Sequence, residues 1–310
     1  MKNFCTVSDK HYLHLGLSMH ESLSKSKSQY TLYYFCVDEE SYNYLVEYDS
    51  RIIPISIPQL CEVNEDLKQL KNVEASFEAK SVTTIEKSNG VNTNNSNELQ
   101  FLYSLSTFSV NYCLRNLNLD HVMYVDADIF FFEDFIYAFN DVGNKSVGVV
   151  ENRVLYPDPN PSGQFNVGIV YFKNDITGLG ASDFWLSCLK NPNNEFASDY
   201  GAFGDQKYLE LVYEGSEEDA IIIGDTCGHL APWNLQFHKY DNINEMIFWK
   251  NNMQKLVYFH FSNFVPDFDA GTYVLGRRHH VYDVDIPFLK EKIKIYFDTL
   301  KKHNQKINYD

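Results

Sequence analysis

The sequence predicts an α/β fold in which a mixed, mostly parallel sheet is flanked by helices in the Rossmann manner. Short β-rich runs alternate with segments whose apolar residues recur at helical spacing, beginning close to the N-terminus. Strands joined by helices in this way form parallel sheets. The 310 residues are enough to enclose a large core, and no internal repeat or linker divides them. We therefore expect one domain spanning residues 1–310.

The first two predicted elements follow one another directly. Residues 3–8 form an apolar run that reads as a strand. A helix is expected over 10–25, because Leu13, Leu17 and Leu23 recur on one helical face. A strand followed at once by a helix is the first unit of the expected winding.

The next segments complete the predicted first half of the sheet. Residues 31–37 are rich in β-formers and read as a strand. The short apolar run 51–57 contains Pro54, which favours an edge or irregular strand. Residues 81–97 are polar and rich in Asn and Ser, which predicts a mobile surface loop, either an insertion or a lid.

The remaining predicted elements alternate in the same way. Helices are expected where apolar residues recur at helical spacing, and strands where β-branched and aromatic residues run together. The predicted helices are 98–118, 181–190, 203–213 and 286–300, and the predicted strands are 121–125, 147–150, 165–172 and 255–261. The last helix carries Ile286, Leu289, Ile293, Phe297 and Leu300 on one face, which is typical of an amphipathic helix that closes a fold.

Charge and composition exclude several classes of protein. The formal net charge of −16 argues against nucleic acid as a partner, because a phosphate backbone requires a basic surface. It leaves room only for a local, peripheral membrane contact through a C-terminal basic cluster. The six cysteines form no CxxC pair, which favours a reducing cytoplasm over a disulfide framework. We expect neither a signal peptide nor a membrane-spanning segment.

Two aspartates, Asp126 and Asp128, directly follow the predicted strand 121–125. Open α/β sheets bind ligands at the carboxyl ends of their strands, and carboxylate oxygens suit Mn²⁺ or Mg²⁺. Without a cation the two carboxylates would repel one another. A divalent ion held here could bridge a diphosphate and neutralise the charge of a leaving group. The alternative is a solvated turn, since Asp-x-Asp alone also occurs by chance.

These aspartates belong to a series of six short segments that covers most of the chain. The segments are Phe4–Asp9 with Tyr12, Tyr124–Ile129, Phe165–Phe172, Gly204–Leu209, Pro232–Leu235 and Phe259–Ser262. In this order they resemble motifs of bacterial glycosyltransferases with the GT-A fold, the nucleotide-sugar-dependent group that contains glycosyltransferase family eight. The matching family motifs are the first strand with its nucleotide-binding turn, the YLDADI segment, the FNxG strand, the DQ helix start, the WNL segment and the late HFSG strand.

The resemblance implies a metal site and a nucleotide site. Asp126, Asp128 and His260 would bind Mn²⁺ or Mg²⁺, and Asp126 would also contact the ribose. Ala127 would line the donor site between the two aspartates. His260 is predicted to face away from its neighbours Phe259 and Phe261 in a strand. The alternative for a lone strand histidine is a structural residue with satisfied hydrogen bonds.

The resemblance also implies which residues contact the donor. Asn166, Asp205 and Gln206 would face the donor sugar and its anomeric centre as catalytic residues, and Thr6 and Asp9 would lie near the base and ribose. Two alternatives stay open at this stage. Asn166 could bond only to backbone groups, and Asp205 could be no more than the N-cap of the helix that follows it.

The sequence departs from the family pattern at two places. The family follows its late motif with a glycine and a lysine that grips the diphosphate, whereas residues 262–265 here contain neither. Arg277 and Arg278 are the candidate replacements, since guanidinium groups suit phosphate geometry. The helix before the Asp-x-Asp strand also lacks the family's cationic residue near 107–110.

The resemblance implies transfer of a hexosyl group from a nucleotide sugar, expected to be a UDP-sugar, to a saccharide or lipid-linked glycan in bacterial surface polysaccharide synthesis. Retention of configuration is the expected outcome. Residues 1–150 would form the nucleotide-binding half, and 151–310 the donor-sugar and acceptor half with the C-terminal helix. One alternative is a phosphohydrolase of the haloacid dehalogenase type, although its motif carries Thr or Val where Ile129 stands here. Another is a non-catalytic relative that binds nucleotide sugars.

Overall fold

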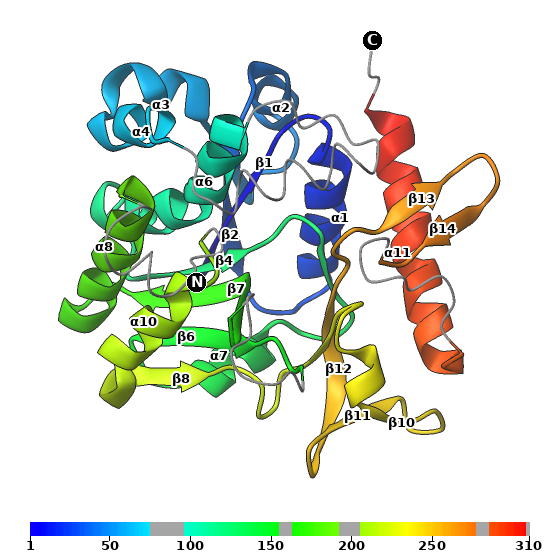
Figure 1. The fold of residues 1–310 in the computed structure, drawn as a ribbon. Coiled ribbons are helices and arrows are strands. Elements are labelled where there is room, and N and C mark those ends of the chain that lie inside the picture. The colour runs from blue at the N-terminus through cyan, green and yellow to red at the C-terminus, as the bar shows by residue number, and fades with distance from the viewer. Residues whose placement is uncertain (75–95, 155–162, 192–204, 277–284, 308–310) are drawn as a thin grey trace.

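The structure, a computed structural model, describes residues 1–74, 96–154, 163–191, 205–276 and 285–307 (Figure 1). The predicted loop 81–97 therefore lies outside the described residues, except that Ser96 and Asn97 begin a helix. The helices are α1 (Leu13–Leu23), α2 (Glu39–Leu45), α3 (Ile57–Val63), α4 (Glu65–Lys71), α6 (Ser96–Arg115), α7 (Ile136–Val142), α8 (Ile176–Lys190), α10 (Tyr208–Gly215) and α11 (Pro287–Lys306). None of them is long and apolar enough to cross a bilayer.

The largest sheet has the strand order β3-β2-β1-β4-β7-β6-β8. Its strands are β1 (Lys2–Ser8), β2 (Tyr30–Cys36), β3 (Ile52–Ser56), β4 (His121–Val125), β6 (Val147–Glu151), β7 (Phe165–Lys173) and β8 (Ala220–Ile222). All neighbours pair in parallel except β7, which runs antiparallel to both β4 and β6. The predicted mixed, mostly parallel sheet is confirmed, and β3 with Pro54 lies at its edge as expected.

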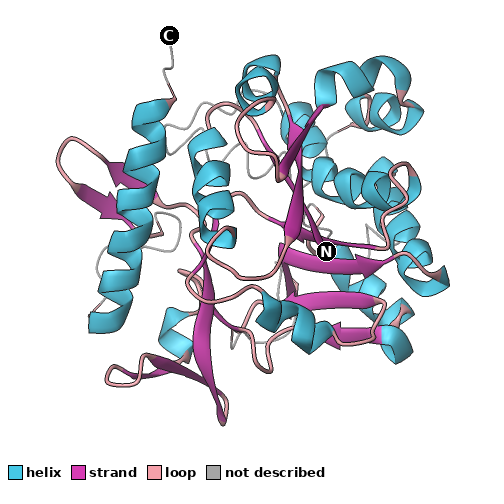
Figure 2. Ribbon diagram, turned by 180° about the vertical axis from the view of Figure 1, so that it is seen from behind, coloured by secondary structure: helices cyan, strands magenta, loops and turns pink. Residues whose placement is uncertain are grey.

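Alternation of side chains along the strands builds a core on each face of this sheet. Cys5 and Tyr124 belong to the core that packs against α6, α8 and α10. Their neighbours Phe4 and Met123 belong to the opposite core, which α1 and α7 cover. Figure 2 shows the strands of this sheet with helices packed around them. The layers leave the carboxyl ends of β1 and β4 together at one edge of the sheet.

A second sheet and the last helix form a separate region beside the first sheet. This sheet contains β5 (Ile129–Phe131), β9 (Gly228–Leu230), β10 (Lys239–Asp241), β11 (Met246–Trp249) and β12 (Asn252–His260), and β13 (Val265–Asp267) pairs with β14 (Thr272–Val274). A third core joins β5 and β12 to α11, and the rings of Phe261 and Tyr296 stack within it. Helix α11 also packs against α1, so that the last helix lies beside the first (Figure 1).

Several short helices were not predicted. Helices α2, α3 and α4 each begin at a side chain that caps the first turn. Asp38, Ser56 and Asn64 accept hydrogen bonds from the backbone N–H groups of Ser41, Gln59 and Leu67. Helices this short present little apolar periodicity, and their sequence signal is therefore the cap rather than the pattern of apolar residues.

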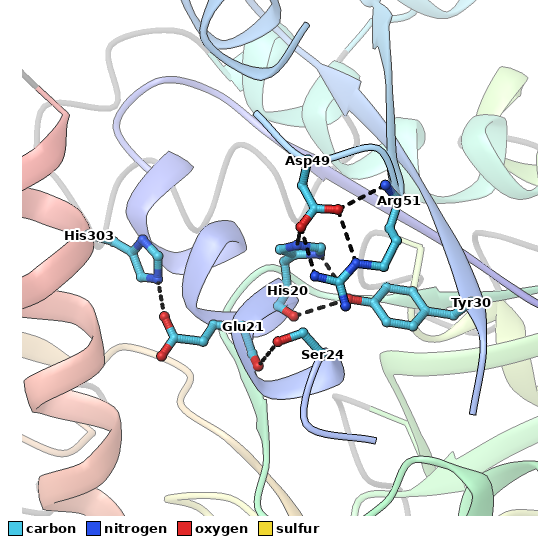
Figure 3. A network of polar contacts seen from close by, with 7 residues as sticks. All are labelled: His20, Glu21, Ser24, Tyr30, Asp49, Arg51 and His303. Carbon is cyan, nitrogen blue, oxygen red and sulfur yellow. Dashed lines mark hydrogen bonds and ion pairs between the residues drawn. The ribbon is translucent and has the colours of Figure 1, made fainter. Parts of the chain in front are cut away.

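A polar network fixes α1 to the elements around it (Figure 3). The ring of His20, a largely buried residue of α1, contacts Asp49 at 3.2 Å and Tyr30 at 3.1 Å. Asp49 in turn binds the Arg51 guanidinium. Glu21, the residue after His20 in α1, contacts His303 of α11 at 2.8 Å. The network ties α1 both to the β2–β3 side of the sheet and to the end of the chain.

Acid should weaken this α1–α11 region. Burial lowers the pKa of His14 to about 4 and also lowers the pKa values of His20 and His303. Below about pH 6.5 these histidines bind protons in the unfolded chain but stay neutral in the folded one. The free energy of unfolding therefore falls as the pH falls. For His14 alone we expect a loss of roughly 2 kcal/mol at pH 5. Urea unfolding of the wild-type protein at pH 7.5 and pH 5.0 measures it.

The matched variants are His14→Gln and, one helical turn earlier, the exposed His11→Gln. The first should lose about 2 kcal/mol less than wild type between the two pH values, because it has no ring to protonate. The second should lose as much as wild type. Equal losses in all three proteins would show that His14 does not stay neutral in the fold.

Candidate functional site

Backbone hydrogen bonds fix the two aspartates beyond β4 on both sides. The N–H of Asp126 donates to the carbonyl of Gly168 in β7 at 2.9 Å. The carbonyl of Asp128 accepts from the N–H of Phe261, just past β12, at the same distance. The tight segment between β4 and β5 is therefore held by both sheets. Its two carboxylates lie at the carboxyl end of β4, as the sequence predicts.

Strand pairing brings a histidine to these carboxylates. Strands β5 and β12 run antiparallel with His260 opposite Ile129, next to Asp128. The His260 Nε2 atom lies 3.1 Å from Asp128 Oδ1 and 3.6 Å from Asp126 Oδ2. One ligand atom from each of the three residues lies within 4.8 Å of the others. Phe259 and Phe261 belong to the third core, which confirms that His260 faces away from them.

Without a cation, the carboxylates of the Asp126–Asp128–His260 cluster repel one another. Burial, with the neighbouring charge of Asp128, raises the pKa of Asp126, although His260 and the Tyr124 hydroxyl oppose the shift. Burial alone would lower the pKa of His260, but the carboxylates of Asp128 and Asp126 outweigh it and raise that pKa. Tyr124 donates to Asp126 Oδ1 at 2.8 Å. A divalent ion would stabilise both carboxylates, and carboxylate oxygens and an imidazole nitrogen are common ligands of divalent metal ions.

Asn166 holds the imidazole of His260 in one orientation. Asn166 Oδ1 lies 3.0 Å from His260 Nδ1 and accepts from the N–H of Gly168 at 2.8 Å. When His260 is neutral, a proton on Nδ1 donates to Asn166 and leaves the Nε2 lone pair facing the aspartates. Metal-binding histidines are oriented by such second hydrogen bonds. Asn166 Nδ2 also donates to Gln206 Oε1 at 3.0 Å, which links the cluster to the Asp205–Gln206 turn.

Asp205 lies in a turn that precedes α10, and it is not the cap of that helix. The helix begins at Tyr208 with Lys207 at the N-cap position, so the N-cap alternative for Asp205 is wrong. Its carboxylate instead accepts a hydrogen bond from the Ser106 hydroxyl of α6. Its backbone carbonyl accepts from the Trp185 indole N–H at 2.9 Å. Burial, together with the charge of Asp126, raises the pKa of Asp205 to about 7.

A cleft of about 780 Å³ gathers most of the predicted site residues. Those that line it are Asp9, Asp126, Ala127, Asp128, Asn166, Asp205, Gln206 and His260. Thr6, predicted to lie near the base, is instead fully buried in β1 and does not line the cleft. Because Val7 and Ser8 do line it, the cleft starts one residue beyond Thr6. Arg277 and Arg278 lie outside the described residues.

Other lining residues were missed by sequence reasoning. Leu99, Leu102, Tyr103 and Ser106 follow one face of α6 at helical spacing and form part of the wall. Their spacing could have grouped them, but nothing in the sequence says which face of this helix meets the cleft. Trp233, which belongs to the segment Pro232–Leu235 singled out from the sequence, also lines the cleft, and its ring lies edge-on to His260 at 5.2 Å. The tryptophan thus packs against the cluster as well as facing the cleft.

Solved structures with the same architecture are glycosyltransferases. The mouse xyloside xylosyltransferase 1 matches 84% of this chain and 97% of its own with a TM-score of 0.52 and 12% identity. The galactosyltransferase LgtC, in complex with donor and acceptor sugar analogues, matches 83% of this chain and 86% of its own with a TM-score of 0.50 and 13% identity. At these identities the likeness concerns the fold alone.

Sequence comparison finds relatives in Bacillus subtilis (strain 168). The uncharacterized protein YfnF is 23% identical over 310 residues, which is 96% of this chain and 91% of YfnF. The uncharacterized protein YfnD is 23% identical over 272 residues, or 84% of this chain and 78% of YfnD. No protein-family model matches the chain. The mixed, mostly parallel sheet flanked by helices and the matched glycosyltransferase structures together show that the chain has the GT-A fold.

Proposed function

We propose that the protein is a metal-dependent glycosyltransferase that moves a hexosyl group from a nucleotide sugar, expected to be a UDP-sugar, to a saccharide or lipid-linked glycan. The observation that carries this proposal is the Asp126–Asp128–His260 cluster, whose ligand atoms lie within 4.8 Å inside a cleft of about 780 Å³. The GT-A fold supports it, because the matched structures with this fold are glycosyltransferases. A role in bacterial surface polysaccharide synthesis is part of the proposal.

The proposed metal ligands are Asp126 Oδ2, Asp128 Oδ1 and His260 Nε2. A Mn²⁺ or Mg²⁺ ion bound there would neutralise the negative charge that develops on the departing nucleoside diphosphate. Asn166 keeps the imidazole oriented, and Tyr124 keeps Asp126 oriented through its hydroxyl. These two contacts hold the ligand atoms in place before the donor binds, which is the electrostatic preorganisation that lowers reaction barriers.

The proposed donor site extends from the cluster in two directions. Asp9 and Ala127, which both line the cleft, would lie beside the nucleotide. Asn166, Asp205 and Gln206 would contact the transferred sugar, because Asn166 and Gln206 continue a hydrogen-bond chain that begins at His260, and Asp205 directly precedes Gln206 and lines the same cleft. Arg277 and Arg278 remain predicted contacts of the diphosphate. We further propose a cytoplasmic protein with at most a peripheral membrane contact, consistent with its six unpaired cysteines.

Binding of nucleoside diphosphates tests the proposal. The midpoint of thermal unfolding is measured with UDP, GDP, CDP and dTDP, each with and without Mn²⁺. A ligand at about 100 times its Kd stabilises a protein by roughly 2.7 kcal/mol, which should raise the midpoint by on the order of 5 °C. We expect one diphosphate, UDP, to give this shift only when Mn²⁺ is present.

The variant Asp128→Asn should abolish the shift, since it removes one proposed ligand at nearly constant volume. No shift with any diphosphate, with or without metal, contradicts the proposed donor site. A metal-dependent shift without turnover of any nucleotide sugar would favour the non-catalytic alternative. Phosphate release from simple esters would favour the phosphohydrolase.

A further inference from the structure

The described wall of the cleft is strongly acidic. It contains the carboxylates of Asp9, Asp126, Asp128 and Asp205 but, among the described residues, no Lys or Arg. In the proposed function a metal ion offsets Asp126 and Asp128. Asp205 is not one of the proposed metal ligands. The only side-chain hydrogen bond described for its carboxylate comes from Ser106, a neutral hydroxyl.

Asp205 is also firmly placed next to the metal cluster. Ser106 is 4% exposed and holds the carboxylate, while the indole of Trp185 holds the backbone carbonyl at 2.9 Å. Gln206, the next residue, reaches the cluster through Asn166. The charge of Asp126 is close enough to raise the pKa of Asp205. A sugar joined to a diphosphate at the cluster would therefore share the cleft with the Asp205 carboxylate.

Building on the proposed function, we propose that Asp205, held by Ser106, restricts the donor to sugars without a carboxylate, so that the cleft accepts a hexosyl group and rejects the matching hexuronosyl group. A uronic acid would bring a further negative charge into the cleft that holds Asp205, whose described wall contains no Lys or Arg. In a partly buried site such a pair repels strongly, because the effective dielectric constant is well below that of water. A neutral hydroxymethyl group in the same place can instead donate a hydrogen bond to the carboxylate.

Matched donor pairs test this selectivity. Isothermal titration of the full chain with Mn²⁺ compares UDP-glucose with UDP-glucuronate and UDP-galactose with UDP-galacturonate. The members of each pair differ only at the sixth carbon. The titrations are run at pH 8.5, above the pKa of about 7 to which burial and the charge of Asp126 raise Asp205. We expect at least tenfold weaker binding of the uronate in whichever pair binds, a difference of about 1.4 kcal/mol or more.

Two variants locate the source of the discrimination. Asp205→Asn keeps the size of the side chain and removes its charge, and it should bring the two members of a pair within about threefold in Kd. Asp298→Asn removes a charge from the exposed side of α11, where Asp298 pairs with Lys294, and should keep the wild-type ratio.

The outcomes separate this inference from the proposed function. Equal binding of the two sugars by the wild-type protein overturns the inference while leaving the proposed donor site intact. Full discrimination in Asp205→Asn also overturns it, because the charge of Asp205 would not be the cause. If no nucleotide sugar of either pair binds, the proposed UDP-sugar donor is wrong and the inference fails with it.

Discussion

Replacing Asp128 with Asn should lower the rate of donor turnover by on the order of 10³-fold. The change removes one of three proposed ligand atoms, and His260 Nε2 loses the carboxylate 3.1 Å away. Removing a single group that stabilises developing charge typically costs a factor of 10² to 10³. The readout is release of nucleoside diphosphate from the donor identified by thermal unfolding, at saturating Mn²⁺. The free energy of unfolding should change little, because Asp128 is partly exposed.

The control for this prediction is the same chemical change far from the cleft. Asp298→Asn should turn over the donor at the wild-type rate, since Asp298 lies on the exposed side of α11. If Asp128→Asn keeps a third or more of the wild-type rate at saturating Mn²⁺, the carboxylate of Asp128 does not act as proposed.

A single methyl group at position 168 should disrupt the same site, because it would collide with the side chains of His260 and Asn166. A Cβ on Gly168 would lie 2.5 Å from His260 Nδ1 and 2.6 Å from Asn166 Oδ1. Both atoms take part in the hydrogen bond that orients the imidazole. Gly168→Ala should therefore displace His260, weaken Mn²⁺ binding by about 10- to 100-fold, as loss of an outer hydrogen bond to a metal ligand does, and lower turnover at least as much.

The matched control is Gly180→Ala in α8. A Cβ there would have no heavy atom within 4 Å, and alanine favours a helix over glycine by about 1 kcal/mol. This variant should be as stable as wild type or more so, with unchanged Mn²⁺ affinity. Wild-type Mn²⁺ affinity in Gly168→Ala would show that the close packing of Gly168 does not set the geometry of His260.

The main sheet could be predicted because its signals are local. Strands β1, β2, β4 and β7 are continuous apolar runs, and the long helices between them carry regular apolar faces. The second sheet was largely missed for the opposite reason. Strands β9, β10 and β13 each have only three residues, which is too short for a two-residue period to be recognised.

The candidate site divides in the same way. Asp126, Asp128, Asn166 and His260 lie in or next to strands with recognisable sequence patterns, and pairing of β4, β5, β7 and β12 brings them together. The contact of Ser106 with Asp205 joins residues 99 positions apart, one in α6 and one in the turn before α10. Such a contact depends on how α6 rotates against the sheet, which the sequence pattern does not specify. Thr6 shows the same limit. Its strand was predicted, but the sequence pattern does not show that Thr6 is buried and that the cleft begins at Val7.

The most direct test of the metal-dependent donor site is the binding of Mn²⁺ itself. Electron paramagnetic resonance of free Mn²⁺ measures how much ion the full chain takes up, with and without UDP, in the wild-type protein and in His260→Ala. We expect one ion per chain, bound more tightly when UDP is present and lost from His260→Ala. Uptake that UDP does not change and that survives His260→Ala would contradict a metal centre at Asp126, Asp128 and His260.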